Sequence, residues 1–356
     1  CADTTRDEPC FWLYSSGSTG KPKGTIHAHG SMIETAELFA QKVLGLTEYD
    51  RIFSAAKLFF AYGLGNALSF PLSVGASVVL LGSRPTPEAV FDILTKQLPT
   101  VFCGVPTLYA RMLADENMPD RDKLMLRVST SAGEALPEEL LSRWEERLGS
   151  TIVDGIGSTE MLHIYLSNSP DNVKPGTTGR PVPGYEVKLL DSQGNELPWG
   201  EIGDLYVKGP SSAIGYWNKL AKSRETFQGE WTKTGDKFWV NPEGYYVYAG
   251  RSDDMLKVSG IYVSPAEVEA ALIKHPSVLE AAVIGAKDEN NLIKPKAYVV
   301  LQQAIEPTET LSQDLKHFVK QHLAPHSYPR WFVYVDELPK TATGKIQRFK
   351  LREMEK

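Results

Sequence analysis

The stretch Tyr14-Ser-Ser-Gly-Ser-Thr-Gly-Lys-Pro-Lys-Gly24 places four serine and threonine hydroxyls, three glycines and two lysines within eleven residues. Glycines allow the backbone to approach a ligand closely, so that consecutive N–H groups can converge on one anion. The hydroxyls add donors, and Lys23 adds a compact positive charge. The preceding run Cys10–Tyr14 is apolar and predicts a buried strand. The sequence therefore predicts a phosphate-binding loop that leaves the edge of a core.

Two other interpretations of this stretch can be weighed from its residues. A Walker loop needs a glycine five residues before the Gly-Lys pair and a serine or threonine after it. Here Ser15 occupies the first position and Pro22 follows Lys21, which disfavours a kinase or a GTPase. A flexible Ser/Gly linker is the second alternative. Two lysines that bracket a proline, directly after a strand, argue against it.

At this loop the sequence resembles the adenylate-forming enzymes, the superfamily of acyl-coenzyme A synthetases, luciferases and peptide-synthetase adenylation domains. The resemblance implies that the loop holds the β- and γ-phosphates of ATP, with Thr19 also taking part in catalysis. The phosphate-binding residues are then Ser15, Ser16, Gly17, Ser18, Thr19, Gly20 and Lys23.

Length and composition restrict the class of protein. A chain of 356 residues suffices for two domains, and 38 basic against 44 acidic residues give no basic excess for nucleic acid. The three cysteines form neither a C-x-x-C pair nor an even set, which favours a reducing, cytoplasmic compartment. The apolar run Leu64–Leu81 is interrupted by two glycines, an asparagine and a proline, so it is interpreted as core elements rather than a membrane span.

Between Lys42 and Gly157, apolar runs alternate with helical periods. Strands are expected at 77–81, 100–103, 127–130 and 151–154, with helices beginning near Thr86, Pro106 and Pro137. This alternation predicts a parallel, doubly wound sheet. Ligands bind such sheets beyond the carboxyl ends of the strands. The loops at those ends are Ser131–Ala135 and Gly157–Glu160.

In the second half of the chain the alternation of strands and helices gives way to short strands and turns. Short strands and turns from Gly179 to Tyr248 predict an antiparallel sheet appended to the large domain. Helical periodicity returns at the capping box Ser264-Pro-Ala-Glu267. We therefore expect an α/β fold with a large domain over residues 1–252 and a small, mobile C-terminal α+β lid domain over residues 253–356. The resemblance also implies a long segment ahead of the phosphate loop, so the large domain is expected to lack its N-terminal part.

Gly157-Ser-Thr-Glu160 matches the G-x-T-E element of the family, and the resemblance makes Glu160 a ligand of the ATP-bound Mg²⁺. A hard cation prefers carboxylate oxygens. The segment Ser131–Pro137 resembles the one that packs along adenine, and Asp154 occupies the position that accepts from the adenine amino group. Ile156 stands where many relatives have an aromatic residue. The adenine-side residues are Gly133, Glu134, Ala135, Asp154, Gly155, Ile156 and Thr159.

Three further motifs follow in the order that the family shows. Thr234-Gly-Asp236 matches the T-G-D whose aspartate accepts from the ribose hydroxyls, and Arg251 matches the arginine on the ribose–phosphate side. Pro339-Lys-Thr-Ala-Thr-Gly-Lys345-Ile matches the C-terminal motif whose lysine reaches the carboxylate and the α-phosphate. Because two anions must meet during adenylation, a fixed cation supplies much of the catalysis.

The resemblance makes Asp253 the hinge about which the small domain turns between two half-reactions. In the second pose the loop of Lys257, Ser259 and Gly260 enters the site, where glycine lets the backbone pass close to the thiol.

The stretch Ala56–Asn66 contains no acidic residue, so an amino acid substrate would bury an ammonium without a partner. An apolar acid is favoured. Together, Lys57-Leu-Phe-Phe-Ala-Tyr-Gly-Leu-Gly-Asn66 and Asp154–His163 resemble benzoate–coenzyme A ligases. His163 either caps the far end of the ring or is packed core. The pocket residues implied are Phe59, Phe60, Ala61, Tyr62, Gly63, Gly157 and His163.

The sequence thus predicts an ATP-dependent aryl-CoA ligase that uses ATP, Mg²⁺ and coenzyme A. A module that loads a carrier protein, and a nucleotide-binding protein without catalysis, are the alternatives. The partners implied are a small aromatic carboxylate and an acetyltransferase and deacetylase acting on Lys345. Neither nucleic acid nor membrane insertion is expected. A homodimer is one alternative for the oligomeric state.

Overall fold

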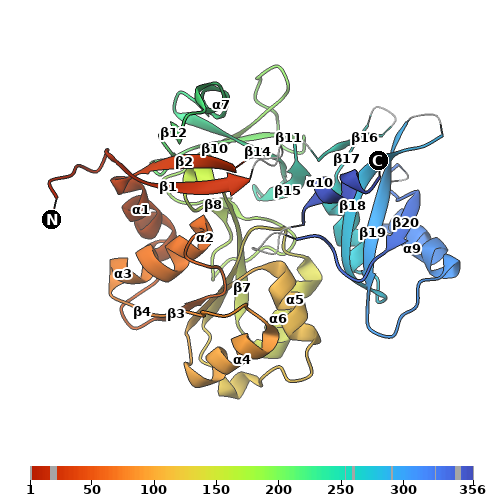
Figure 1. Cartoon of the computed structure of the whole chain (residues 1–356), viewed down its shortest axis with the longest axis horizontal. Coiled ribbons are helices and arrows are strands. Elements are labelled where there is room, and N and C mark those ends of the chain that lie inside the picture. Colours follow the sequence, from red (N-terminus) through yellow and green to blue (C-terminus); the bar gives the residue numbers. More distant parts are fainter. Residues whose placement is uncertain are drawn as a thin grey trace. The chain divides into compact units, whose positions relative to one another are not determined.

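The computed structural model describes residues 2–16, 22–252, 254–258, 261–289, 292–324, 326–340 and 346–355. The chain forms two compact units, one of residues 1–234 with 238–248 and the other of residues 235–237 with 249–356 (Figure 1). The domain boundary that we place between residues 252 and 253 stays a prediction.

A seven-stranded sheet in the order β4-β3-β5-β6-β7-β8-β9 organises the first unit. The strands β4 to β7 run parallel, and β8 and β9 add antiparallel, which confirms the predicted doubly wound sheet. Three helices connect the parallel strands: α4 (Pro87–Lys96), α5 (Pro106–Ala114) and α6 (Glu138–Leu148). The strands are β3 (Arg51–Ser54), β4 (Ser77–Val79), β5 (Val101–Gly104), β6 (Val128–Ser131), β7 (Thr151–Gly157), β8 (Ile164–Ser167) and β9 (Arg180–Pro181).

Both faces of this sheet are buried, as a parallel sheet requires. Successive residues of a strand point to opposite faces, so Phe53 and Phe102 pack with helices α4, α5 and α6 around Trp144. Ile52 and Val101 instead belong to the core on the other face, together with Phe39 and Phe70.

The apolar run Leu64–Leu81 becomes short elements of the first unit. It contributes the end of α2 (Ala61–Leu64), η2 (Gly65–Ser69), α3 (Phe70–Val74) and β4, and Phe70 is fully buried. Two helices precede it, α1 (His29–Thr35) and η1 (Ala36–Gln41). Within the part of the chain that the structure describes, no helix is both long enough and apolar enough to cross a membrane.

A separate three-stranded sheet in the order β1-β2-β12 carries the phosphate-binding stretch. It consists of β1 (Pro9–Ser16), β2 (Pro22–Ala28) and β12 (Gly215–Tyr216). The strand predicted at Cys10–Tyr14 is present within β1, but the prediction that it is buried is wrong, because β1 lies at the edge of this sheet. Leu13 is buried, but Trp12 is 42% and Tyr14 is 64% exposed.

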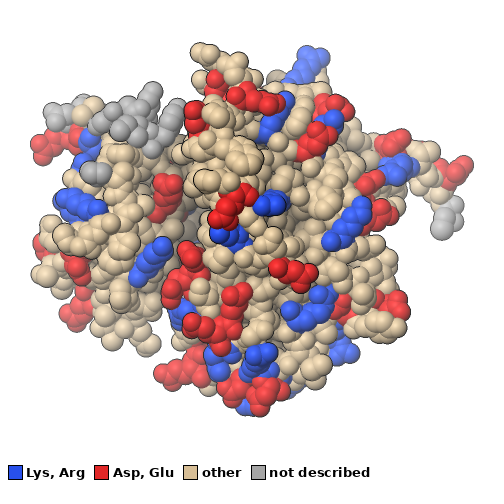
Figure 2. All heavy atoms as spheres, turned by 180° about the vertical axis from the view of Figure 1, so that it is seen from behind, with Lys and Arg blue, Asp and Glu red and all other residues tan. Residues whose placement is uncertain are grey.

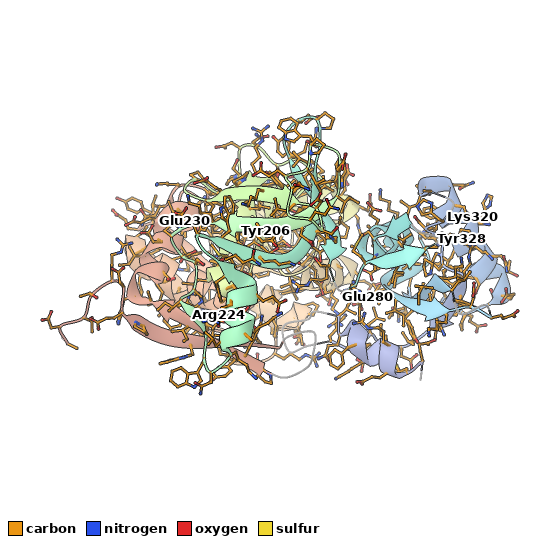
Figure 3. The ribbon with its side chains drawn as sticks, turned by 90° about the horizontal axis from the view of Figure 1, so that it is seen from above. Tyr206, Arg224, Glu230, Glu280, Lys320 and Tyr328 are labelled. Carbon is orange, nitrogen blue, oxygen red and sulfur yellow. The ribbon has the colours of Figure 1, made fainter. Side chains whose placement is uncertain are left out.

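The predicted antiparallel sheet follows; most of it belongs to the first unit, but residues 235–237 of one strand and 249–251 of another belong to the second. Its order is β10-β11-β14-β13, and β15 also pairs with β14. Tyr206 on β11 and Arg224 on the neighbouring helix α7 (Leu220–Thr226) mark this region in Figure 3. The strands are β10 (Glu186–Leu190), β11 (Gly203–Lys208), β13 (Phe227–Gln228), β14 (Trp231–Val240) and β15 (Tyr246–Arg251). Two 3₁₀ turns, η3 (Arg121–Lys123) and η4 (Thr159–Met161), complete the first unit.

The second unit is built on the sheet β18-β19-β20, whose first pair is antiparallel and whose second pair is parallel. Ser264 caps helix α8 by accepting from the Glu267 N–H at 3.2 Å, as predicted. Tyr328 and Lys320 of this unit lie together in Figure 3, with the Lys320 ammonium 4.2 Å from the ring centroid. The elements are β16 (Leu256–Val258), β17 (Ile261–Val263), α8 (Pro265–Ile273), β18 (Val278–Lys287), β19 (Ile293–Leu301), α9 (Glu309–His322), β20 (Trp331–Tyr334) and α10 (Arg348–Glu353).

Acidic and basic side chains alternate over the face drawn in Figure 2, and no broad region of one sign dominates it. This mixed surface accords with the net charge of −6. It gives no electrostatic footprint for a nucleic acid on that face.

Candidate active site

The stretch predicted to bind phosphate has its two described ends in the strands of a β-hairpin. Strands β1 and β2 pair antiparallel up to Ser16 and Pro22, so the described ends of the loop are held together. The hydroxyl oxygen of Ser15 is buried and has no hydrogen-bond partner among the described residues. The hydroxyl could therefore donate a hydrogen bond to an anion bound at this place. Several predicted site residues lie outside the described residues: Gly17, Ser18, Thr19, Gly20, Asp253, Ser259, Gly260 and Lys345, as do the side chains of Ser16 and Lys257.

Lys23 on β2 and Glu160 on η4 meet in a partly buried ion pair. The Lys23 Nζ lies 2.8 Å from Glu160 Oε1, and these side chains are 20% and 13% exposed. Burial by itself would raise the pKa of Glu160, but the charge of Lys23 and the hydrogen bonds from Lys23 and Tyr216 outweigh it and lower the pKa. Glu160 is therefore held as a carboxylate.

Tyr216 of β12 is the third member of this cluster, and sequence reasoning missed it. Its hydroxyl donates to Glu160 Oε1 at 2.7 Å and accepts from Lys23 Nζ at 2.7 Å. The ammonium also lies 4.3 Å from the centroid of the tyrosine ring. A single tyrosine 193 residues from Lys23 carries no local signal, so only the strand pairing reveals it.

His27 supports the segment that carries Glu160, and sequence reasoning missed it as well. Its Nε2 lies 2.7 Å from the Thr159 carbonyl oxygen, which ties the G-x-T-E segment to β2. Burial lowers the pKa of His27 more than the bond to Thr159 raises it, so the ring is neutral at pH 7. The Ser158 hydroxyl also accepts from the Met161 N–H at 3.2 Å, which closes the turn that presents Glu160.

Glu160 fits the Mg²⁺ of a bound nucleotide. No group of three or more metal-ligating side chains gathers within the described ranges. Mg²⁺ commonly takes one or two protein carboxylates and fills its remaining positions with water and phosphate oxygens. A buried carboxylate whose partner is a flexible lysine matches this requirement, because the lysine can leave when the cation arrives.

The residues predicted to lie beside adenine meet at the carboxyl ends of β6 and β7. Ser131 pairs with Asp154 in the parallel register, so the segment that follows Ser131 lies beside Gly155 and Ile156. Burial dominates Asp154 and raises its pKa well above 3.8, although Ser131 and the Gly155 amide oppose this effect. Its Oδ1 is buried and has no partner within the described ranges. This free acceptor fits an amino group such as that of adenine.

Gly133, Glu134 and Ala135 lie in the loop that leaves β6, where Gly133 has a φ of 97°. A residue with a side chain would be strained in that conformation. Ile156 is half-buried at the start of the antiparallel pairing with β8. The structure thus brings the predicted adenine segments together, and Thr159 follows directly on η4.

In the second unit, Asp236 and Arg251 form an ion pair. Arg251 Nη1 lies 3.0 Å from Asp236 Oδ1, and Asp236 is 5% exposed. Gly235 has a φ of 77°, and a Cβ built there would lie 2.9 Å from the guanidinium of Arg251. The positive φ therefore favours glycine in the T-G-D motif, and the missing side chain leaves room for the guanidinium.

The predicted pocket residues lie around α2 and the end of η4. The Tyr62 hydroxyl is 2.6 Å from the Thr130 hydroxyl, which fixes the ring against β6. The Tyr62 ring stacks on His163 at 5.6 Å between centroids, and the Phe70 ring meets the imidazole edge-on at 4.4 Å between centroids. Ala61 begins α2, directly after the neighbouring rings of Phe59 and Phe60, whose centroids are 4.4 Å apart.

His163 is 3% exposed, and burial lowers its pKa to about 3. The imidazole is therefore neutral at pH 7. Its Nε2 lies 3.4 Å from the Tyr62 carbonyl oxygen, whereas Nδ1 has no partner within the described ranges. The ring is packed among aromatic side chains and yet keeps one unused polar atom.

Two positions of this region require glycine because neighbouring backbone passes beside them. A Cβ on Gly63 would lie 2.0 Å from the Lys57 carbonyl oxygen, and one on Gly157 would lie 2.4 Å from that of His163. Because glycine has no Cβ, α2 and the G-x-T-E segment can pass this close to the neighbouring backbone. Any side chain at either position would displace the pocket.

The C-terminal motif is held at both described ends. Lys340 and Ile346 form a β-bridge, and the Gln347 N–H donates to the Pro339 carbonyl oxygen at 2.8 Å. The Lys340 ammonium also lies 2.6 Å from a carboxylate oxygen of Glu280, which Figure 3 labels on β18. The ends of the segment that carries Lys345 are thereby anchored to the sheet of the second unit.

Comparison with known proteins identifies the class. Residues 2–217 match the AMP-binding enzyme family, and residues 267–345 match the AMP-binding enzyme C-terminal domain. The chain therefore belongs to the AMP-binding enzyme family, which confirms the predicted adenylate-forming superfamily.

Particular relatives narrow the comparison to enzymes named for aromatic acids. The chain is 62% identical over 352 residues to a benzoate–CoA ligase of Thauera aromatica. The matched region covers 99% of this chain and 67% of that relative. It thus spans about two thirds of the relative's length. A benzoate CoA ligase structure from Burkholderia xenovorans LB400 is 59% identical, with a TM-score of 0.94, and the match covers 99% of this chain and 70% of that one. An anthranilate CoA ligase in complex with anthranoyl-AMP is 49% identical, with a TM-score of 0.96 and coverage of 100% and 69%.

Proposed function

We propose that this protein is an ATP-dependent aryl-CoA ligase that activates benzoate or a similar aromatic carboxylate. The observation that carries the proposal is the partly buried Lys23–Glu160 pair beside the hairpin that we assign to phosphate. It occurs in a chain 62% identical to a benzoate–CoA ligase. A cation for phosphate and a carboxylate for Mg²⁺ are the two charges that adenylation needs.

The first half-reaction joins the acid to AMP. A carboxylate oxygen attacks the α-phosphorus, the new C–O–P linkage forms, and the bond from the α-phosphorus to the β-bridging oxygen breaks, so that pyrophosphate leaves. Because attacker and target are both anionic, fixed cations lower the barrier. Lys23 serves the phosphates, and Lys345 is assigned to the carboxylate and α-phosphate. Bound Mg²⁺ supplies further charge neutralisation.

The second half-reaction forms the thioester. The sulfur of coenzyme A, having lost its proton, attacks the acyl carbon, and AMP leaves with the electrons of the broken acyl–oxygen bond. The assigned roles are Asp253 as the hinge and Lys257, Ser259 and Gly260 as the loop that admits the thiol. Separate poses suit two reactions that need different surfaces around one intermediate.

An aromatic substrate is supported by the surroundings of His163. Its imidazole is packed between the rings of Tyr62 and Phe70, and because it is neutral it adds no charge to this apolar region. The stretch Ala56–Asn66 has no acidic residue to pair with an ammonium. We assign Phe59 and Phe60 to the entrance, and the unused Nδ1 of His163 to the far end of the ring.

Other expectations remain part of the proposal. Acetylation of Lys345 would remove the charge required for adenylation. Cys10 and Cys103 are free thiols, which suits a reducing compartment such as the cytoplasm. Homodimer formation stays an alternative to the monomer.

Product analysis tests the function. The purified chain is incubated with MgATP and benzoate, first without and then with coenzyme A. We expect benzoyl-AMP and pyrophosphate in the first case and benzoyl-CoA and AMP in the second. A phosphopantetheinylated carrier protein offered in place of coenzyme A should accept no benzoyl group. If benzoyl-AMP never forms, or if only the carrier protein is acylated, the proposal is wrong.

A further inference from the structure

Lys23, Glu160 and Tyr216 form a closed set of contacts that joins three elements far apart in the sequence. All three of their mutual polar distances lie between 2.7 and 2.8 Å. Both partners bind the same carboxylate oxygen, Oε1 of Glu160. The carboxylate thus has one charged partner and one neutral partner at a single atom.

The two partners differ in how firmly they are held. Tyr216 is 5% exposed, its ring contacts Phe227 at 5.3 Å, and its backbone N–H donates to the Ser223 hydroxyl at 2.9 Å. Strand β12 also pairs with β2 at Gly215 and Tyr216. Lys23 reaches the carboxylate through four methylene groups, and such a side chain adopts many rotamers. The tyrosine is the fixed partner, and the lysine is the movable one.

The backbone places Glu160 in reach of this fixed hydroxyl. The Ala213 N–H donates to the Glu160 carbonyl oxygen at 2.8 Å, so the segment before β12 is bonded to η4. The tyrosine and the carboxylate therefore belong to one hydrogen-bonded framework. Movement of Lys23 leaves that framework unchanged.

We propose that Tyr216 is a positioning residue that keeps the Glu160 carboxylate oriented while Lys23 leaves it for phosphate and Mg²⁺ takes its place. This inference rests on the proposed function, which makes Glu160 the ligand of the nucleotide-bound Mg²⁺. Without nucleotide, Lys23 compensates the buried charge. When phosphate draws Lys23 away, a cation must replace it, because an unpaired buried carboxylate is unfavourable.

The proposal predicts how strongly ATP binding depends on Mg²⁺. Without Mg²⁺, ATP that recruits Lys23 leaves the Glu160 carboxylate without a cation, so binding is weak whether or not the tyrosine hydroxyl is present. With Mg²⁺, the carboxylate regains a cation, and Tyr216 presents it in the correct orientation. We define the magnesium gain as the ratio of the ATP dissociation constant in EDTA to that in excess Mg²⁺.

The experiment measures both constants by calorimetry, with ATP as the probe and with neither benzoate nor coenzyme A present. Tyr216→Phe keeps the ring and removes the hydroxyl. Hydrogen bonds to charged groups are worth enough to change binding about tenfold or more. We expect the magnesium gain to fall about tenfold in Tyr216→Phe. A merely structural role would instead weaken ATP binding equally in EDTA and in Mg²⁺, and that result would overturn the proposal.

Tyr245→Phe is the matched control. The Tyr245 hydroxyl donates to Asn172 Oδ1 at 2.9 Å, a bond of similar length in the same unit that does not involve Glu160. This variant should keep the wild-type magnesium gain. If it loses as much of the gain as Tyr216→Phe does, the effect is general and the proposal fails.

Variants of Glu160 separate this proposal from the proposed function. Glu160→Gln should abolish the magnesium gain, and adding Tyr216→Phe should then change it no further. A wild-type gain in Glu160→Gln would overturn the metal assignment in the proposed function. Loss in Glu160→Gln with full retention in Tyr216→Phe would overturn the role of Tyr216 alone.

A second variant changes the other partner of the contact between Glu160 and Tyr216. Glu160→Asp keeps the charge but withdraws the carboxylate by one methylene from the fixed hydroxyl. Its magnesium gain should fall as in Tyr216→Phe, and this measurement decides the question even if Tyr216→Phe does not fold. An unchanged gain in Glu160→Asp would contradict the proposal.

Discussion

Asp50 joins the amino ends of the parallel strands, and replacing it with asparagine should destabilise the first unit without changing the active site. The Asp50 carboxylate accepts from the Thr47 N–H at 2.9 Å and from the Thr100 hydroxyl at 2.7 Å. Arg127 adds two bonds through Nε and Nη2, at 2.8 and 2.9 Å. Asparagine has nearly the same shape but carries no charge for Arg127. Ligands of such sheets bind at the opposite, carboxyl ends of the strands.

The pKa of Asp50 sets the magnitude. Burial by itself would raise it, but the bonds from Arg127, Thr100 and Thr47 and the charge of Arg127 lower it from 3.8 to about 2. One pKa unit corresponds to about 1.36 kcal/mol, so the lowering of the Asp50 pKa on folding corresponds to about 2.5 kcal/mol of stabilisation. Arg127 is 38% exposed, so solvent screens part of the attraction. We expect Asp50→Asn to lower the free energy of unfolding by about 2 kcal/mol at pH 7.

The sign of the pH dependence follows from the lowered pKa. The folded carboxyl group holds its proton less tightly than the unfolded one, so the stabilisation is complete above about pH 4 and is lost as the pH falls toward 2. The difference between wild type and Asp50→Asn should therefore shrink through that window. Below this pH window, the Asp50 carboxyl should no longer make the wild type more stable than Asp50→Asn.

Urea unfolding followed by tryptophan fluorescence measures the effect, because Trp144 is fully buried in the first unit. Asp120→Asn is the control, since Asp120 makes its ion pair with Arg147 in solvent at 3.0 Å, and no measurable change is expected. The reasoning is refuted if both variants lose equal stability at pH 7. It is also refuted if the loss in Asp50→Asn is as large at pH 3 as at pH 7.

Three further predictions concern catalysis. Lys345→Ala should reduce adenylation by several powers of ten, because the carboxylate and α-phosphate lose their cation. Thioester formation from supplied benzoyl-AMP should fall far less, and equal losses in the two assays would contradict the assignment. Asp253→Pro should still release pyrophosphate while benzoyl-CoA production falls, because proline fixes φ and blocks the hinge; near wild-type thioester rates would exclude Asp253 as the hinge. Ala61→Phe should raise the KM for benzoate strongly and leave that for ATP nearly unchanged, since added volume in a packed pocket is unfavourable. Steady-state kinetics that instead rank palmitate above benzoate in kcat/KM for the wild type would show that the pocket is not built for a ring.

Local signals in the sequence were sufficient for much of the framework. Thr86 before Pro87 predicted the start of α4, and the Thr86 hydroxyl accepts from the Ala89 N–H at 3.3 Å. The helix predicted to begin near Pro137 is α6, and it ends directly before Gly149, whose φ of 64° is the conformation that glycine adopts readily after a helix. Caps and turns depend on residues within a few positions of one another, so their free energies can be judged from a short window. The alternation of strands and helices likewise predicted the parallel sheet.

Burial along β1 could not be judged in that way. The apolar run predicted a buried strand, but Trp12 and Tyr14 lie on the exposed side of an edge strand. Whether an apolar residue is buried depends on which element covers it. That covering is decided by the packing of the whole unit rather than by the residue's neighbours in the chain.

The same distinction separates the predicted site from the one that the tertiary structure builds. Lys23 and Glu160 were identified one by one, through the motifs in which they occur. Their contact, across 137 residues, and the hydroxyl of Tyr216 that completes it come from the pairing of β2 with β12 and the bonding of η4 to the segment before β12. Sequence by itself determined which chemical groups are present and how the chain turns locally. Only tertiary structure decided which of those groups meet, because the free energy that holds distant segments together is shared among strand pairing and core packing that no single segment contains.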